Sequence, residues 1–262
     1  LANLAMGCAT LASEGPVRLR PFPFGRQAVR VAQRLFDRVG FQLIDYRPPC
    51  SEIKDAQFYR PMFSPWLSSE WSERLHAHDP RSLVPLHAKY LLYCLALDAT
   101  RRCWGEVAEC GVYKGGTAKI LAELVSDRPL HLFDTFCGMP QTDPKRDLHK
   151  AGDFADTTLE SVCGYLSGHA NVNLVAGTIP QSLDAVNDRK FCFVHIDLDI
   201  YSSIRAACEF FYPRLEQGGR LLFDDYGYPS CPGARAAVDE FFADKPETKI
   251  AMVTGQCSVQ KL

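Results

Sequence analysis

The chain has 262 residues, of which 47% are hydrophobic and 23% charged, and it carries a net charge of −2 with a pI near 6.4. This length fits one large α/β domain, alone or with an N-terminal appendage. No basic run stands out and no apolar run is long enough to cross a bilayer, so neither nucleic acid nor a membrane is an expected partner.

The 11 cysteines are odd in number and scattered, and no pair has C-x-x-C spacing. Cys110 and Cys192 fall in apolar strand patterns, and Cys94 and Cys208 fall in helical ones. A disulfide framework is not expected in a chain of this size. Reduced, core-filling cysteines are typical of a cytoplasmic protein, which is the compartment that we expect.

The first 80 residues are predicted to form an N-terminal extension. Residues 1–12 are apolar but have no basic region ahead of them, which favours an ordinary helix or a frayed end over a signal peptide or lipid anchor. Residues 27–39 have apolar positions at helical spacing. Residues 58–71 combine aromatic side chains with Pro61 and Pro65. This aromatic segment fits an irregular cover over the main core, which we favour, or a lid over a substrate pocket.

Residues 81–262 have the regular pattern of a main domain. A helix is expected at 83–100, and strand-like runs then alternate with helical segments. The expected strands are 105–110, 130–134, 172–176, 191–198, 220–223, 249–254 and 258–262. The expected helices that follow the first five of them are 117–125, 157–166, 180–186, 202–215 and 234–243. This alternation predicts an α/β fold with a doubly wound parallel sheet, closed at one edge by an antiparallel C-terminal hairpin.

A glycine-containing turn, E-C-G-V-Y-K-G-G-T, joins the first strand to the next helix at residues 109–117. Gly111 permits a tight turn, and such a turn can hold a nucleotide-like ligand at the carboxyl end of a sheet. The spacing is not G-x-G-x-x-G. Glu109 suits the ammonium group of an amino-acid-bearing ligand better than a pyrophosphate, and Asp134, at the end of the second strand, is well placed for ribose hydroxyls.

Four carboxylates, Asp197, Asp199, Asp224 and Asp225, follow two strands that a helix connects. Such a crossover is nearly always right-handed and parallel, so both strand ends meet at one edge of the sheet. Crowded carboxylates raise each other's pKa unless a cation neutralises them, and oxygen ligands favour Mg²⁺, Ca²⁺ or Mn²⁺. Asp199 could instead cap the next helix. His195, on the face of Asp197, is expected to be a core histidine bonded to backbone.

The motifs E-C-G-V-Y-K-G-G-T, D-T-F-x-G-M-P, H-I-D-L-D-x-Y-x-S and D-D-Y-G-x-P-x-C-P-G-A occur in this order. Together they resemble the macrocin O-methyltransferase family, from roughly Ser82 to the C-terminus. The resemblance implies a class I, Rossmann-like S-adenosylmethionine (SAM) methyltransferase fold. It also implies a SAM- and Mg²⁺-dependent enzyme that methylates sugar hydroxyls of macrolide or aminocoumarin antibiotics, and so a small-molecule glycoside or sugar as acceptor. A homo-oligomer fits the family as well.

The resemblance also assigns residues to roles. The residues implied to surround SAM are Ser82, Leu83, Glu109, Gly111, Tyr113, Gly115, Thr117, Asp134 and Gly138. Those implied to bind the metal are Asp197, Asp224 and Asp225. His149 looks like the family's loop histidine, so it is a candidate general base. Asp199 is the alternative base. The metal would bind two oxygens of a sugar diol, and the base would accept the hydroxyl proton.

Three other functions remain open. A nicotinamide-dependent oxidoreductase shares the turn and the acid after the second strand, but it needs no carboxylate cluster. Catechol- and caffeoyl-type methyltransferases share the metal chemistry and act on aromatic diols. A non-catalytic SAM-binding subunit is the third, and four concentrated acids argue against it.

Overall fold

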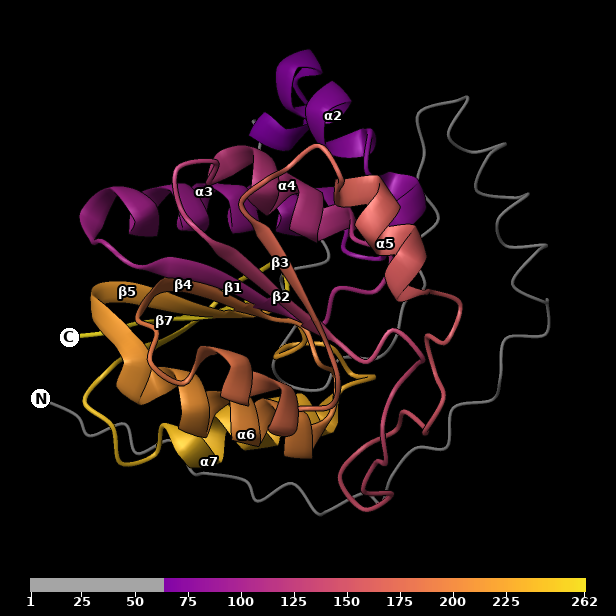
Figure 1. Ribbon diagram of the computed structural model, residues 1–262. Helices are drawn as coiled ribbons and strands as arrows, with labels where there is room; N and C mark the ends of the chain where they lie inside the picture. Colours follow the sequence, from indigo (N-terminus) through magenta and orange to yellow (C-terminus); the bar gives the residue numbers. More distant parts are fainter. Residues whose placement is uncertain (1–63) are drawn as a thin grey trace, which may run out of the picture. The chain divides into compact units, whose positions relative to one another are not determined.

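The computed structural model describes residues 64–262 (Figure 1). Every described residue belongs to one compact unit of the chain, which spans residues 60–262. The expectations for residues 1–12, 27–39 and 58–63 therefore lie outside the described part. Residues 64–80, assigned to the extension from the sequence, fold as part of this unit.

A seven-stranded sheet in the order β3-β2-β1-β4-β5-β7-β6 forms the centre of this unit. The strands are β1 (Glu106–Cys110), β2 (Leu130–Asp134), β3 (Val172–Ala176), β4 (Phe191–Ile196), β5 (Leu215–Phe223), β6 (Lys249–Ala251) and β7 (Cys257–Gln260). The first five are parallel, and β7 pairs antiparallel with both β5 and β6. The predicted doubly wound sheet with an antiparallel C-terminal hairpin is confirmed.

Helices cover both faces of the sheet. Figure 1 shows α3 (Leu86–Arg102), α4 (Gly116–Leu124) and α5 (Leu159–Leu166) above it, with α6 (Tyr201–Phe211) and α7 (Pro232–Phe241) below. Two hydrophobic clusters fill the spaces between these layers. Every residue of β4 is buried, as expected for a central parallel strand covered on both sides. On α3, Ala88, Leu92, Ala96 and Ala99 form a buried stripe at helical spacing.

The observed elements differ from the predicted ones mainly at β5 and near residue 181. β5 starts at Leu215 instead of 220 because the polar, glycine-rich stretch ahead of Arg220 still pairs. Gly218 donates a backbone hydrogen bond to Lys261, and Lys261 donates one to Gly219. The helix expected near residue 181 is a 3-10 segment, Gln181–Val186.

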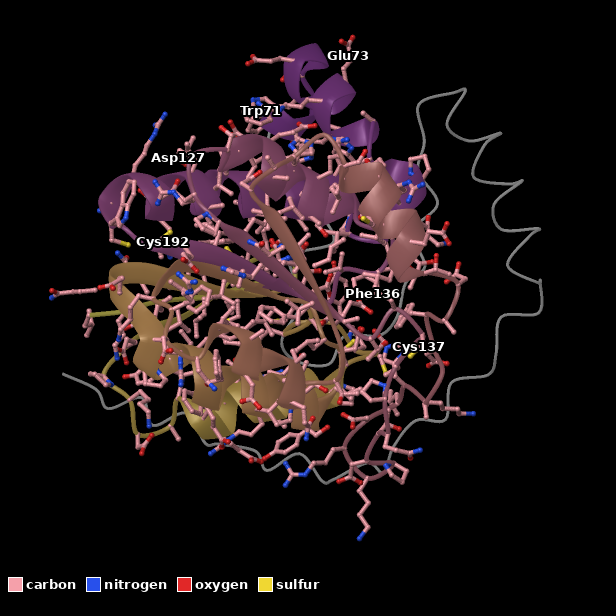
Figure 2. All side chains as sticks on the ribbon, in the orientation of Figure 1. Trp71, Glu73, Asp127, Phe136, Cys137 and Cys192 are labelled. Atoms are coloured by element: carbon pink, nitrogen blue, oxygen red, sulfur yellow. The ribbon has the colours of Figure 1, made fainter. Side chains whose placement is uncertain are left out.

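The described part of the aromatic segment packs on α3. Trp66 lies 5.9 Å from Tyr90 between ring centroids, and Trp71, on α2 (Ser69–His76), contacts Tyr90 and Tyr93 edge-on at 5.0 and 4.9 Å. Figure 2 shows Trp71 well away from Phe136 and Cys137, which follow the carboxyl end of β2. These two tryptophans therefore pack on α3, and the choice between cover and lid stays a prediction because residues 58–63 lie outside the described part.

Every cysteine of residues 64–262 is free, and Cys110, Cys192 and Cys208 are buried in the core, as expected. Among the helices of that range, none has the length and apolar character needed to cross a bilayer.

Candidate active site

A cavity of about 450 Å³ opens at the carboxyl ends of the parallel strands. Its volume lies within the range of ligand pockets, roughly 300–1,000 Å³. The predicted site residues that line it are Ser82, Leu83, Gly111, Tyr113, Thr117, Asp134, Gly138, His149, Asp197, Asp199, Asp224 and Asp225. Glu109 and Gly115 are the two predicted site residues that do not line it.

The turn after β1 is held by the carboxylate of Asp134. Its Oδ2 accepts hydrogen bonds from the backbone N–H groups of Val112 and Tyr113, both at 2.8 Å, and its Oδ1 accepts one from Phe136. Asp134 was predicted to bind ribose hydroxyls. A carboxylate has about four acceptor positions, so one remains for that role while the other bonds fix the turn.

Glycines let neighbouring segments approach this turn closely. Gly111 has φ +89°, and a Cβ there would lie 1.7 Å from the backbone oxygen of Asp197. A Cβ on Gly116, the first residue of α4, would lie 2.6 Å from the Cβ of Ser82. Gly115, with φ +89°, is the N-cap of α4. Gly115 thus shapes the turn without lining the cavity, and Gly116 lets Ser82 and Leu83 reach the cavity wall.

Glu109 is fully buried and belongs to a chain of buried polar side chains. Glu109 and His195 are register partners on β1 and β4, and Glu109 Oε1 lies 2.8 Å from His195 Nδ1. His195 Nε2 lies 3.4 Å from Asp224 Oδ1, which also accepts a 2.7 Å hydrogen bond from Gln256. Burial alone lowers the pKa of His195, but hydrogen bonds with Asp224 and Glu109 outweigh it and raise that pKa to about 9.

This chain of contacts corrects one expectation, because His195 bonds two carboxylates instead of backbone. The second oxygen of Glu109, Oε2, is buried without a hydrogen-bond partner in the described structure. Its proximity to the turn keeps it a candidate for the ammonium group proposed from the sequence.

Three carboxylates converge at the other end of the cavity. Asp197, Asp199 and Asp225 each place an oxygen within 4.8 Å of the others. Burial, followed by the charges of Asp225 and Asp224, raises the pKa of Asp197 well above its usual range. Burial and the charge of Asp199 do the same to the pKa of Asp225. A cation among them would remove this repulsion.

The converging set differs from the predicted metal triad of Asp197, Asp224 and Asp225. Asp224 lines the cavity, but its Oδ1 is held by His195 and Gln256. Asp199, and not Asp224, lies near Asp197 and Asp225. Its φ of +59° falls in the left-handed region that few residues other than glycine adopt. Its backbone N–H donates to Asp225 Oδ2 at 2.9 Å, which holds this strained conformation.

His149 reaches the cavity from the loop between β2 and α5. Two backbone hydrogen bonds, from Met139 to Asp153 and from Gly152 to Met139, close this loop on itself. His149 Nε2 lies 3.6 Å from Asp199 Oδ1, so the two candidate bases are neighbours.

Sequence reasoning missed Asp147, which is 5% exposed. Its Oδ1 accepts from the backbone N–H of Tyr201 at 2.9 Å, and its Oδ2 accepts from Asp143. A charged residue in a polar loop gave no signal of this role.

Cys231, 3% exposed, was also missed. It lines the cavity, and its Sγ lies 3.3 Å from Asp199 Oδ1 and 3.6 Å from His149 Nε2. The C-P-G-A motif that contains Cys231 is part of the family resemblance, but its sequence indicates no role for the thiol.

The arrangement fits SAM and Mg²⁺, the two groups that the family resemblance implies. Oxygen atoms of Asp197, Asp199 and Asp225 lie within 4.8 Å of one another, and carboxylate oxygens are the ligands that Mg²⁺ prefers. The turn with Asp134, which lines the cavity, provides an acceptor for the hydroxyls of a nucleoside.

The sheet order and the site at its carboxyl edge define a class I SAM-dependent methyltransferase fold. The same fold occurs in the solved structure of the O-methyltransferase NovP, with a TM-score of 0.60 and 21% identity, covering 69% of this chain and 82% of that one. Residues 90–257 match the family model of macrocin-O-methyltransferase (TylF), and the chain belongs to that family.

Two curated relatives have names that specify the molecule that each of them methylates. One, from Streptomyces olivaceus, is an 8-demethyl-8-(2,3-dimethoxy-alpha-L-rhamnosyl)-tetracenomycin-C 4'-O-methyltransferase, 25% identical over 160 residues that cover 55% of this chain and 61% of the relative. The other, mycinamicin III 3''-O-methyltransferase from Micromonospora griseorubida, is 27% identical over 155 residues, 52% of this chain and 60% of the relative. The chain thus spans about three fifths of the length of these relatives.

Proposed function

We propose that the protein is a SAM-dependent, Mg²⁺-dependent O-methyltransferase that methylates a hydroxyl of a sugar or glycosylated natural product. One observation carries the proposal. A single cavity joins the Asp134-bound turn, suited to a nucleoside, to the converging carboxylates Asp197, Asp199 and Asp225. Family membership supports the methyl-transfer chemistry.

In this proposal the chain's residues divide into a cofactor side and an acceptor side. When bound, SAM supplies an electrophilic methyl group, and a divalent cation supplies a Lewis acid that lowers the pKa of an acceptor hydroxyl. Gly111, Tyr113 and Asp134 hold the cofactor side, while Asp197 and Asp225 hold the cation, with Asp199 or Asp224 as a further oxygen ligand. Fixing both reactants in one cavity can lower the barrier by roughly 7–11 kcal/mol.

A proton must leave the acceptor hydroxyl, and two neighbouring groups can accept it. His149 Nε2 and Asp199 Oδ1 lie 3.6 Å apart at the cavity wall. His149 Nδ1 lies 3.3 Å from Asp153 Oδ2, so Asp153 favours the tautomer with the proton on Nδ1 and leaves Nε2 free to accept. We therefore assign the proton acceptor to His149, with Asp199 as the alternative.

The proposed acceptor is a sugar hydroxyl instead of an aromatic diol. The name of the relative from S. olivaceus specifies a rhamnosyl group, and that comparison supports a glycoside acceptor here. We further propose a cytoplasmic enzyme of natural-product biosynthesis, consistent with the free cysteines of the described chain.

The test is methyl transfer from radiolabelled SAM to a panel of glycosides, with their aglycones and catechol as controls. We expect labelled glycoside with Mg²⁺, no product after EDTA, and recovery on added Mg²⁺. If catechol is the one compound that is methylated, the acceptor is an aromatic diol and the proposed sugar acceptor is wrong. Calorimetry that detects NAD binding and no SAM binding would overturn the proposal, and so would full activity in Asp225→Asn with EDTA.

A further inference from the structure

A second group of potential metal ligands lies beside the carboxylates. His149, Asp199 and Cys231 come from three separate segments, and their ligand atoms face one another. Sγ of Cys231 lies 3.3 Å from Asp199 Oδ1 and 3.6 Å from His149 Nε2, and the latter two atoms are 3.6 Å apart. The three atoms therefore form a nearly equilateral triangle on the cavity wall.

This triangle has the dimensions of one face of a tetrahedral zinc site. With zinc–ligand distances of about 2.0–2.1 Å for nitrogen and oxygen and about 2.3 Å for sulfur, ligand atoms of a tetrahedral ion lie about 3.3–3.6 Å apart. Each observed separation lies within about 0.3 Å of the tetrahedral value for its pair of atom types. A zinc ion could therefore bind with little rearrangement of the three side chains.

The partner of His149 adds an independent feature of a zinc site. A zinc-bound histidine usually donates its other ring N–H to a carboxylate, which fixes the tautomer and the ring orientation. Nδ1 of His149 faces Asp153 Oδ2 at 3.3 Å, leaving Nε2 toward Cys231 and Asp199. The ring also lies 5.4 Å from Phe154 between centroids, which limits its rotation.

We propose that His149, Asp199 and Cys231 form a binding site for Zn²⁺ or a similar thiophilic divalent ion, which shares Asp199 with the carboxylate cluster but uses neither Asp197 nor Asp225. The ligand types separate the two ions, because Mg²⁺ prefers oxygen ligands while thiolate and imidazole select zinc. Binding displaces the thiol proton of Cys231 into solvent. All three residues line the cavity, so water or an acceptor oxygen could reach an ion bound to them.

Zinc at this site inhibits the enzyme. This consequence rests on the proposed function, because bound zinc occupies Nε2 of His149 and the carboxylate of Asp199, the two candidate proton acceptors. The binding itself does not depend on catalysis and can be measured without turnover.

The test uses Co²⁺ as a spectroscopic probe of the full chain, with Mg²⁺ in excess to fill the oxygen site. One equivalent of Co²⁺ should give a thiolate-to-cobalt charge-transfer band and the intense visible bands of tetrahedral cobalt, and Zn²⁺ should displace it. Cys231→Ser should abolish the charge-transfer band, whereas Cys163→Ser, at an exposed cysteine, should retain it. Absence of the band in the unsubstituted protein, or its survival in Cys231→Ser, would overturn the site.

Two further variants keep the test decisive if Cys231→Ser does not fold. Asp153→Asn should weaken Co²⁺ binding by about 10–100-fold, the usual effect of losing an outer partner of a metal-bound histidine. His149→Ala should keep a thiolate band while losing the tetrahedral visible bands. Unchanged affinity in both variants would exclude the site.

The inhibitory role is measured separately, as the Zn²⁺ concentration that halves methyl transfer at saturating Mg²⁺. In Cys231→Ser, this Zn²⁺ concentration should be about tenfold higher or more, with inhibition measured against the rate of the same variant without zinc. Equal inhibition of both proteins would overturn the inhibitory role. A protein that binds Co²⁺ as described but transfers no methyl group would retain the zinc site and refute the proposed function.

Discussion

Asp147 Oδ1 accepts a hydrogen bond from the backbone N–H of Tyr201 at 2.9 Å, which ties the loop that carries His149 to the first residue of α6. A Cβ on Gly233 would lie 2.0 Å from the same oxygen, so the first turn of α7 closes over the bond. Arg146 adds an ion pair with Glu240 at 3.0 Å. The loop therefore reaches the cavity from a fixed base on α6 and α7.

Asp147→Ala should lower kcat by roughly 10²-fold, the cost of about 1 Å of displacement of a catalytic group. It should also lower the free energy of unfolding by about 1–3 kcal/mol, because two backbone donors lose a buried acceptor. Methyl transfer and denaturant unfolding measure these effects. Lys145→Ala, at an exposed position of the same loop, is the matched control. An unchanged kcat in Asp147→Ala would show that the anchor does not position His149.

Mg²⁺ should stabilise the protein, because a cation that binds only the folded state relieves the crowding of Asp197, Asp199 and Asp225. At 100 times its Kd the gain is about 2.7 kcal/mol, or about 5–11 °C in Tm for a domain of this size. Without the cation, Asp197→Asn should have a higher Tm than the unsubstituted protein, because it removes one of the crowded carboxylates that disfavour each other's ionised form. Asp197→Asn should also lose most of the increase in Tm that Mg²⁺ causes. A Mg²⁺ shift of equal size in Asp197→Asn, by calorimetry, would remove this residue from the cation site.

Gly116→Ala should weaken SAM binding. The added Cβ would lie 2.6 Å from Ser82 Cβ and 2.8 Å from the backbone oxygen of Arg81, so residues 81–82 must move away from the cavity. We expect a cost of about 1–3 kcal/mol in stability and a higher Kd by calorimetry. Gly164→Ala, with open space around its Cβ position on α5, should instead stabilise by about 0.5–1 kcal/mol. A gain in stability for Gly116→Ala would mean that the segment of Ser82 adapts without cost.

Stability should fall as the pH decreases below about 6.5, partly because of His78. Burial lowers the pKa of His78 below its value in the unfolded chain, against the charge of Glu123, so the unfolded state binds more protons in the window between the two values. The contribution of neutral, buried His78 to stability is fully present above the pKa of this residue in the unfolded chain. It is lost as the pH falls toward the lower pKa of His78 in the folded protein. His78→Gln should reduce this loss, measured by denaturant unfolding between pH 5 and pH 8. If the free energy of unfolding of His78→Gln depends on pH as in the unsubstituted protein, His78 does not contribute to this loss of stability.

The sequence predicted the sheet because short runs rich in apolar residues alternate with helical segments from residue 105 onward. Asp197 and Asp225 could be placed at one edge because parallel crossovers leave little choice. The orientation of Asp224 could not be predicted, because its partner Gln256 lies 32 residues away in the chain and precedes β7. Asp147 and Cys231 were missed for a similar reason, since their roles depend on side-chain contacts between distant segments.

The close approach of Gly111 to Asp197 has a consequence for how acceptor preference can change. The N–H of Asp197 also donates to the carbonyl of Cys110 at 2.8 Å, so the ends of β1 and β4 are joined directly. The distance between the proposed methyl donor and cation is therefore built into the sheet and is the same for every acceptor. Exchange of loop residues around a retained His149 can then alter which acceptor enters while the distance between the proposed methyl donor and cation stays the same.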